Sequence, residues 1–142
     1  MTSPDRRVIV VVAAIVEEDG RFLVTRRLRG THLAGLWEFP GGKCEPGETH
    51  QACLVREMAE ELGVQAIVGG ELLRTEHTYA TRTVRLHFRR CHIAGRPRAL
   101  LNQEMRWVTR EQLRSLEFPP ADAELIRLLV EGPPFAPAQG LD

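Results

Sequence analysis

Residues 42–64 constrain the fold of this chain more than any other segment. They read GKCEPGETHQACLVREMAEELGV, and we predict a helix over residues 49–62, between a threonine suited to the N-cap and a glycine suited to the position after the last turn. An α-helix advances about 100° per residue, so Glu57, Glu60 and Glu61 are expected to lie on one side of it. The segment therefore predicts a helix that presents three carboxylates together.

Such a carboxylate face is either a metal site or an ordinary solvated surface. Like charges three or four residues apart repel by a few tenths of a kcal/mol per pair, and a bound divalent cation would neutralise them. A ligand set made only of oxygens favours Mg²⁺ or Mn²⁺ over zinc. The opposite arc of the helix is predicted to face a core through Ala52, Leu54, Val55, Met58, Ala59 and Leu62.

Length and charge limit the class of protein. The 142 residues suit one domain, 1–142, for which we expect an ordered core of about 7–131 and a Pro/Gly-rich tail over 132–142. Lys plus Arg and Asp plus Glu both number 19, so no global basic field favours stable binding of nucleic acid. The first residues show no signal peptide and no segment is long enough to span a bilayer, so we expect a cytoplasmic protein without a membrane partner. Three cysteines without zinc-binding spacing are expected to be free thiols.

The remaining pattern predicts strands interleaved with helices. Residues 17–20 (Glu-Glu-Asp-Gly) are typical of a hairpin turn, and the glycine pair after Pro40 predicts a sharp turn that opens a loop. The fold class expected is α/β, an α/β/α sandwich around a mixed β-sheet. Strands are predicted over 8–16, 21–25, 36–39, 66–77, 83–94 and 105–109, a short helical turn over 110–116, and a second long helix over 121–130.

The helical segment also resembles a known family. It matches the Nudix hydrolase signature at every position, namely Gly42, Glu48, Arg56, Glu57, Met58, Glu60, Glu61, Gly63 and Val64. The runs TRRLRGTHLAGLWEFPGGK (25–43) and FPPAD (118–122) are similar to the MutT branch, nucleoside triphosphate pyrophosphohydrolases that act on oxidised purine nucleotides such as 8-oxo-dGTP and include CTP- and dCTP-type relatives. The resemblance implies the Nudix fold and hydrolysis of a small nucleotide to monophosphate and pyrophosphate, in sanitation of the nucleotide pool.

The resemblance also implies a catalytic centre. Mg²⁺, for which Mn²⁺ can substitute, would be bound by the helix glutamates and a backbone carbonyl of the glycine pair, that is by Glu57, Glu60, Glu61 and Gly41 or Gly42. Glu57 would orient or deprotonate the attacking water, with Glu48 as a supporting residue or alternative base. Arg56 would hold the segment together, four residues before Glu60.

The substrate is expected to contact charged and aromatic side chains outside the helix. Lys43 can offset phosphate charge, Arg27 can reach sugar or phosphate, and Phe39 suits an apolar slot for the base. The full set of expected substrate-binding residues is Arg27, His32, Glu38, Phe39, Lys43, Arg82 and Asp122.

Asp122 stands where the branch reads the base edge, at a position that is asparagine in some members. An ionised carboxylate only accepts hydrogen bonds, so it would prefer a base edge with N–H groups unless burial keeps it protonated. Guanine and cytosine edges both fit, and the alternative role for Asp122 is to cap the helix that follows it.

One position departs from the branch. A glutamate is common six residues before the tryptophan that Trp107 matches, but this chain has Leu101 there. Either Glu104 substitutes for it or the helix carboxylates act alone.

Alternatives to the oxidised-purine enzyme remain open. They are a CTP/dCTP-type pyrophosphatase, a broad hydrolase of nucleoside diphosphate derivatives, a Nudix-fold binding module, and a nucleic-acid-acting domain of this fold. The intact signature disfavours the binding module. The neutral charge balance disfavours the nucleic-acid-acting domain. The protein is expected to be a monomer or a homodimer.

Overall fold

A computed structural model of the chain describes residues 7–28, 30 and 34–133. Residues 1–6 and 134–142, which make up most of the expected terminal tails, and the expected substrate residue His32 lie outside this part. Within it, no helix is both long and apolar enough to cross a membrane.

The centre of the fold is a mixed seven-stranded sheet. Its strands are β1 (Arg7–Glu18), β2 (Arg21–Arg26), β3 (Trp37–Glu38), β4 (Gly41–Lys43), β5 (Gln65–Thr78), β6 (Arg82–Ala94) and β7 (Glu104–Thr109). Their order is β3-β2-β1-β6-β5, with β4 paired to β1 and β7 to β2. Only β1 and β6 are parallel, from Arg7 beside Arg82 to Val16 beside Cys91, and the other pairings are antiparallel.

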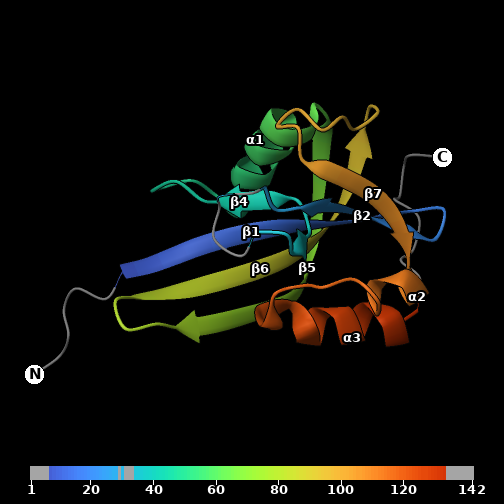
Figure 1. Ribbon diagram of the computed structural model, residues 1–142. Helices are drawn as coiled ribbons and strands as arrows, with labels where there is room; N and C mark the ends of the chain where they lie inside the picture. Colours follow the sequence, from blue (N-terminus) through green and yellow to red (C-terminus); the bar gives the residue numbers. More distant parts are fainter. Residues whose placement is uncertain (1–6, 29, 31–33, 134–142) are drawn as a thin grey trace, which may run out of the picture.

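Helices cover both faces of the sheet (Figure 1). The helix α1 (His50–Leu62) lies on one face, and α2 (Arg110–Leu113), a 3₁₀ turn (Pro120–Asp122) and α3 (Ala123–Glu131) lie on the other. Alternate side chains of β1 point to the two faces, so Val12 and Val16 enter the core under α1, while Ala13 and Ile15 enter the core under α3. This is the expected α/β/α sandwich.

The segments at the ends of β1 and α1 follow the sequence closely. Asp19 and Gly20 have positive φ angles of 52° and 76°, as a tight hairpin turn requires. The hydroxyl of Thr49 accepts a hydrogen bond from the amide of Ala52 at 3.0 Å, and Gly63 ends the helix with φ 68°. The turn joins β1 to β2, and the caps fix where α1 begins and ends.

Two details of the sequence interpretation were wrong. Gly41 and Gly42 do not form a turn: they belong to β4, which pairs with β1, because a long-range strand partner is invisible in the local sequence. The buried arc of α1 does not include Ala52 and Ala59, which are exposed; it consists of Cys53, Leu54, Met58 and Leu62.

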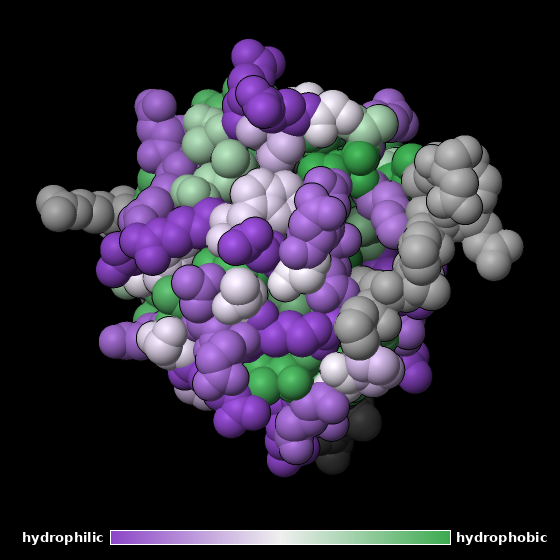
Figure 2. Space-filling view, turned by 90° about the vertical axis from the view of Figure 1, so that its right-hand side faces the viewer, coloured by the Kyte–Doolittle hydropathy of each residue, from purple (hydrophilic) through white to green (hydrophobic). Residues whose placement is uncertain are grey.

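The exposed large hydrophobic residues are spread over several elements of the fold. Val8, Leu28, Ile67, Tyr79, Leu100, Leu101 and Leu128 are the exposed ones among the described residues. On the face shown in Figure 2, hydrophobic side chains form separate areas between hydrophilic ones. Scattered exposure of this kind is ordinary for a folded domain and does not by itself mark an interface.

Candidate active site

The buried face of α1 explains where its three glutamates lie. Residues four apart on a helix form a row, and Cys53 at the head of one row is fully buried. Glu57 and Glu61 follow Cys53 in that row, so both lie at the edge of the core, and their carboxyl groups share a hydrogen bond. Glu60 belongs to the next row with Arg56, and its side chain is 60% exposed. The structure therefore brings two of the three glutamates together.

Gly42 lies directly against the carboxyl group of Glu57. A Cβ atom at Gly42 would lie 2.4 Å from the Glu57 carboxyl carbon and 2.5 Å from its nearer oxygen. No side chain fits between this strand and the helix. The glycine allows the carboxylate to rest on the β4 backbone.

The backbone carbonyl groups of β4 alternate in direction along the strand. Gly42 is opposite Val12 and midway between two backbone hydrogen bonds that join the strands, so its own carbonyl belongs to the ladder with β1. The carbonyls of Gly41 and Lys43 face the other way, and that of Lys43 accepts a hydrogen bond from Arg56 at 3.1 Å. Gly41 thus directs its backbone oxygen away from β1.

The guanidinium of Arg56 connects the loop, the strand and the helix. It donates to both oxygens of Glu48, from Nε at 2.8 Å and Nη2 at 2.9 Å, and Nη1 donates to Glu57 at 2.9 Å. Nη1 also lies 3.5 Å from Glu60, four residues along the helix, and Nη2 reaches the Lys43 carbonyl. One planar cation therefore fixes three carboxylates and a strand.

Glu48 is a poor base in this setting. The hydrogen bonds from Arg56 lower the pKa of Glu48 to about 2, with a further contribution from the Glu45 amide, which donates to Oε1 at 2.9 Å. Both carboxylate oxygens are occupied. Glu48 acts here as the anchor that orients Arg56.

Glu61 has the opposite electrostatic character. Burial is the largest of the causes that together raise the pKa of Glu61 to about 9; the hydrogen bond and charge of Glu57 and then the charges of Glu38 and Glu60 act in the same direction. Without a cation, the pair holds a proton at neutral pH. A site of this kind therefore favours a bound cation, which would stabilise the ionised carboxylates.

These residues fit a hard divalent cation. The donors are carboxylate oxygens with a backbone carbonyl nearby, the strand leaves room because Gly42 lacks a side chain, and the local excess of negative charge needs a counter-ion. Glu57 and Glu61 would hold the cation, with the Gly41 carbonyl beside them and Glu60 reachable by a rotation of its exposed side chain.

A narrow cleft of about 130 Å³ leads from Glu61 to two substrate residues predicted from the sequence. Arg27 and Glu38 line it, and Arg27 donates to both oxygens of Glu38 at 3.1 and 3.2 Å. Burial raises the pKa of Glu38, and the charge of Arg27 opposes that shift. The cleft therefore contains both an arginine that can contact a phosphate and a carboxylate suited to a metal ion.

The sequence interpretation missed Gln103, which closes this cleft. Its side chain is buried, accepts from the Leu101 amide at 2.9 Å and donates to the Glu61 carbonyl at 3.3 Å, so it ties the loop after β6 to the end of α1. Nothing in the local sequence marks it. Glu104 does not take part: its oxygens bind Arg26 at 3.3 Å and Arg106 at 2.8 Å.

Phe39 and Asp122 lie on the α3 side of the sheet, beside Glu38. Phe39 is buried and stacks on Phe118 with ring centroids 5.3 Å apart. Asp122 is buried, and burial together with the charge of Glu38 raises its pKa to about 7. Its side chain makes no capping hydrogen bond to α3. Helix capping therefore does not explain this aspartate.

Two expected substrate residues stand apart from this cluster. Lys43 is exposed on β4, and Arg82 is exposed at the turn between β5 and β6, where its guanidinium lies 5.7 Å from the ring centroid of Tyr79. In the β1 register Arg82 pairs with Arg7, four residues from Val11, the partner of Lys43. The structure does not bring Arg82 to the carboxylates.

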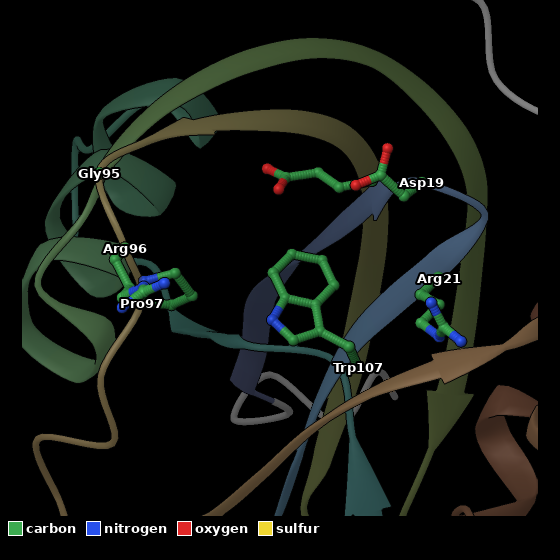
Figure 3. A pocket seen from close by; sticks show the side chains of 7 residues that line it. Asp19, Arg21, Gly95, Arg96, Pro97 and Trp107 are labelled. Carbon is green, nitrogen blue, oxygen red and sulfur yellow. The ribbon is translucent and has the colours of Figure 1, made fainter.

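A wider hollow of about 510 Å³ lies elsewhere, beside the β1–β2 turn (Figure 3). Trp107 forms its floor, and Asp19, Arg21 and Arg96 stand around the indole ring. None of the Nudix-signature residues lines it. We therefore place the candidate active site at the smaller cleft, which is lined by Arg27, Glu38 and Glu61.

Comparisons with known proteins relate the chain to a family. Residues 11–128 match the NUDIX domain family. The chain is 38% identical to the CTP pyrophosphohydrolase of Escherichia coli (84% of this chain, 90% of that protein) and 36% identical to the 8-oxo-dGTP diphosphatase of Haemophilus influenzae (89% and 94%). It is also similar to the solution structure of MutT, a Nudix hydrolase of Staphylococcus aureus, with a TM-score of 0.75 at 35% identity over 89% of this chain and 99% of that one.

Proposed function

This chain belongs to the MutT-like branch of the Nudix family and is a phosphoanhydride hydrolase, and we propose that it converts oxidised purine nucleoside triphosphates such as 8-oxo-dGTP to monophosphate and pyrophosphate with Mg²⁺. The observation that carries the proposal is the half-buried pair of Glu57 and Glu61 against Gly42, with Glu61 in one cleft with Arg27. Such an enzyme would cleanse the nucleotide pool before DNA synthesis, in the cytoplasm.

The reaction is an in-line attack of water on phosphorus, in which the new P–O bond forms as the bond to the leaving phosphate breaks. A bound Mg²⁺ supplies neutralisation of the charge on the phosphate oxygens. Glu57 is the residue we assign to orient the water and receive its proton at a carboxylate oxygen, because it lies beside Glu61 and Arg56 binds only one of its two oxygens. Glu48 supports Arg56 rather than acting as the base.

The remaining residues bind the nucleotide. Arg27, released from Glu38 or bridging it, contacts phosphate or sugar, and Lys43 offsets phosphate charge. Phe39 supports the base slot from below through its stack on Phe118. Asp122 reads the base edge, and with a pKa of about 7 it can both donate and accept near neutral pH, as an amide would. Arg82 would reach the nucleotide only from the turn between β5 and β6, and His32 is proposed from the sequence alone.

A cytosine nucleotide is the second candidate substrate. The 38% identity to a CTP pyrophosphohydrolase supports it, and an aspartate that accepts hydrogen bonds suits the exocyclic amine of cytosine. Rates with both kinds of nucleotide therefore decide the substrate.

The test is a panel of nucleotides with Mg²⁺, comprising 8-oxo-dGTP, dGTP, CTP, dCTP and 5-methyl-dCTP. ADP-ribose and a diadenosine polyphosphate serve as controls from other substrate classes. We expect kcat/KM for 8-oxo-dGTP to exceed that for dGTP, with monophosphate and pyrophosphate as products. A higher kcat/KM for cytosine nucleotides would replace the purine assignment with the pyrimidine one. No hydrolysis of any compound would leave only a binding module.

Removal of the cation is expected to abolish hydrolysis and lower stability. Excess EDTA should stop turnover, and Mg²⁺ or Mn²⁺ should restore it. At about 100 times its dissociation constant a cation that binds only the folded state adds about 2.7 kcal/mol, so thermal unfolding should shift upward with Mg²⁺. Full activity in excess EDTA would contradict this prediction.

Replacement of Asp122 by Ala is expected to change base preference more than the rate of the chemical step. Loss of a base-edge hydrogen bond costs about 1–3 kcal/mol in kcat/KM for the base that uses it, which is about 10- to 100-fold. The ratio of kcat/KM between 8-oxo-dGTP and CTP, measured in both proteins, checks this. An equal fall for all nucleotides would assign Asp122 a structural role instead.

Asp122 also predicts a pH dependence of stability. Its pKa rises on folding from 3.8 to about 7, so the folded state binds the proton more tightly. The resulting stabilisation is complete below the unfolded pKa and is lost as pH rises through the folded pKa, that is between pH 3.8 and about 7. Asp122→Asn should remove this component, so denaturant unfolding at about pH 5 and about pH 8 should differ less in the variant than in the parent protein. Parallel pH profiles for the two proteins would refute the shift.

A further inference from the structure

A second cluster of ligand-type side chains lies at the opposite end of α1 from Glu61. His50 is the first residue of that helix, His87 is on β6, and Glu71 is on β5. One ligand atom from each of the three lies within 4.8 Å of the others. His50 precedes Glu57 by seven residues, which is about 10 Å along a helix axis, so this cluster is separate from the hydrolytic carboxylates.

A β-bulge creates the cluster. Glu71 pairs with Arg89 and Leu73 with Phe88, so Leu72 is an extra residue on β5. In a regular strand Glu71 and Arg74, three apart, would point to opposite faces, but the bulge puts both on the face of His87. The carboxylate of Glu71 thus reaches Nδ1 of His87 at 2.5 Å.

The helix completes the cluster from above the sheet. His87 is beside Val12 in the β1 register, and Val12 packs under α1, so His87 points to the α1 side. His87 is buried, and its ring centroid lies 4.2 Å from that of His50. Burial lowers the pKa of His50, with further lowering by the charges of His87 and Arg89, which favours the neutral imidazole that a metal binds.

The cluster opens into a cavity. The cavity, of about 660 Å³, is lined by both histidines and by Arg74 and Arg85. The guanidinium of Arg85 is already paired with Glu76 at 2.7 Å. The cavity therefore leaves room for a bound ion beside the two imidazoles.

We propose that His50, Glu71 and His87 form a second metal site, specific for a borderline divalent cation such as Zn²⁺ and distinct from the Mg²⁺ site of the hydrolytic carboxylates. Two imidazoles and one carboxylate are a typical three-residue zinc ligand set, whereas oxygen-only sites select Mg²⁺. Zinc here would tie the start of α1 to the bulge between β5 and β6.

The test is a titration of the full chain with Co²⁺ and Zn²⁺ in saturating Mg²⁺. Co²⁺ reports its ligands by visible absorption, and competition gives the Zn²⁺ affinity. We expect the parent protein to bind one zinc ion per chain. The zinc affinity should fall about tenfold or more in His50→Ala and in Glu71→Gln. It should be unchanged in His77→Ala, because His77 is an exposed histidine on β5, the strand of Glu71. Hydrolysis with Mg²⁺ alone should persist in His50→Ala, which verifies its fold.

Two other sites could bind zinc and must be separated from this one. Cys44, Glu48 and Cys53 also have ligand atoms within 4.8 Å of one another, and zinc favours thiolates. Loss of zinc in Cys44→Ser, or in Glu61→Gln, with full binding in His50→Ala would overturn the proposal. Equal affinity in the parent protein and in both cluster variants would overturn it as well.

Discussion

Glu57→Gln is expected to reduce kcat by about 10³-fold or more while the fold persists. The amide is nearly isosteric but cannot accept the proton of the attacking water, and loss of a positioned base alone costs about 10²- to 10⁴-fold. It also removes one of the two charges that form the metal-type pair with Glu61. Single-turnover hydrolysis of 8-oxo-dGTP at saturating Mg²⁺ measures the effect.

Glu61→Gln is expected to show a comparable loss that higher Mg²⁺ partly reverses. Glu61 contributes charge to the cation rather than contact with water in our assignment, so its variant should mainly raise the Mg²⁺ concentration needed for half-maximal rate. The exposed Glu45, in the same loop as Glu48, supplies a control through Glu45→Gln, which should behave as the parent protein. Unchanged rates in either helix variant would remove the proposed centre.

Gly42→Ala is expected to inactivate the enzyme almost as fully as loss of Glu57. The new methyl group would lie 2.4 Å from the Glu57 carboxyl carbon, closer than van der Waals contact allows, so the carboxylate must move off the β4 backbone. Displacement of a catalytic group by about 1 Å costs on the order of 10²-fold in rate. kcat/KM measured at several Mg²⁺ concentrations reports the loss.

Gly70→Ala is the matched control for this substitution. A Cβ atom at Gly70 meets nothing within 4 Å, and the residue has no positive φ angle. It should retain full activity. Circular dichroism and thermal unfolding of both variants separate local displacement from misfolding. A fully active Gly42→Ala protein would show that contact between this strand and Glu57 does not matter for hydrolysis.

The helix and its caps were predictable because they depend on neighbours in sequence. Thr49 and Gly63 act within one or two turns, and the structure has α1 over residues 50–62 with the expected caps. The contact of Arg56 with Glu60 follows from the same spacing. The α/β/α architecture followed from the order of strand and helix patterns.

Properties that depend on packing were not predictable. The wheel of α1 places three glutamates on one side, but burial of Cys53 rather than Ala52 turns Glu57 and Glu61 toward the edge of the core and leaves Glu60 exposed. The strand β4 exists only because β1 lies beside it. Gln103 and the bulge at Leu72 have no local signal, and the raised pKa of Asp122 arises from its burial beside Glu38.

The most direct test of the central claim is a count of bound Mn²⁺ by electron paramagnetic resonance in the parent protein and in Glu61→Gln, with His50→Ala as background for the second site. Mn²⁺ takes the same oxygen ligands as Mg²⁺ and is detected without turnover. The account predicts that the parent protein and His50→Ala bind Mn²⁺ alike and that Glu61→Gln loses at least one ion while its circular dichroism is unchanged. Equal binding in all three proteins would contradict the assignment of the Glu57–Glu61 pair as the metal centre.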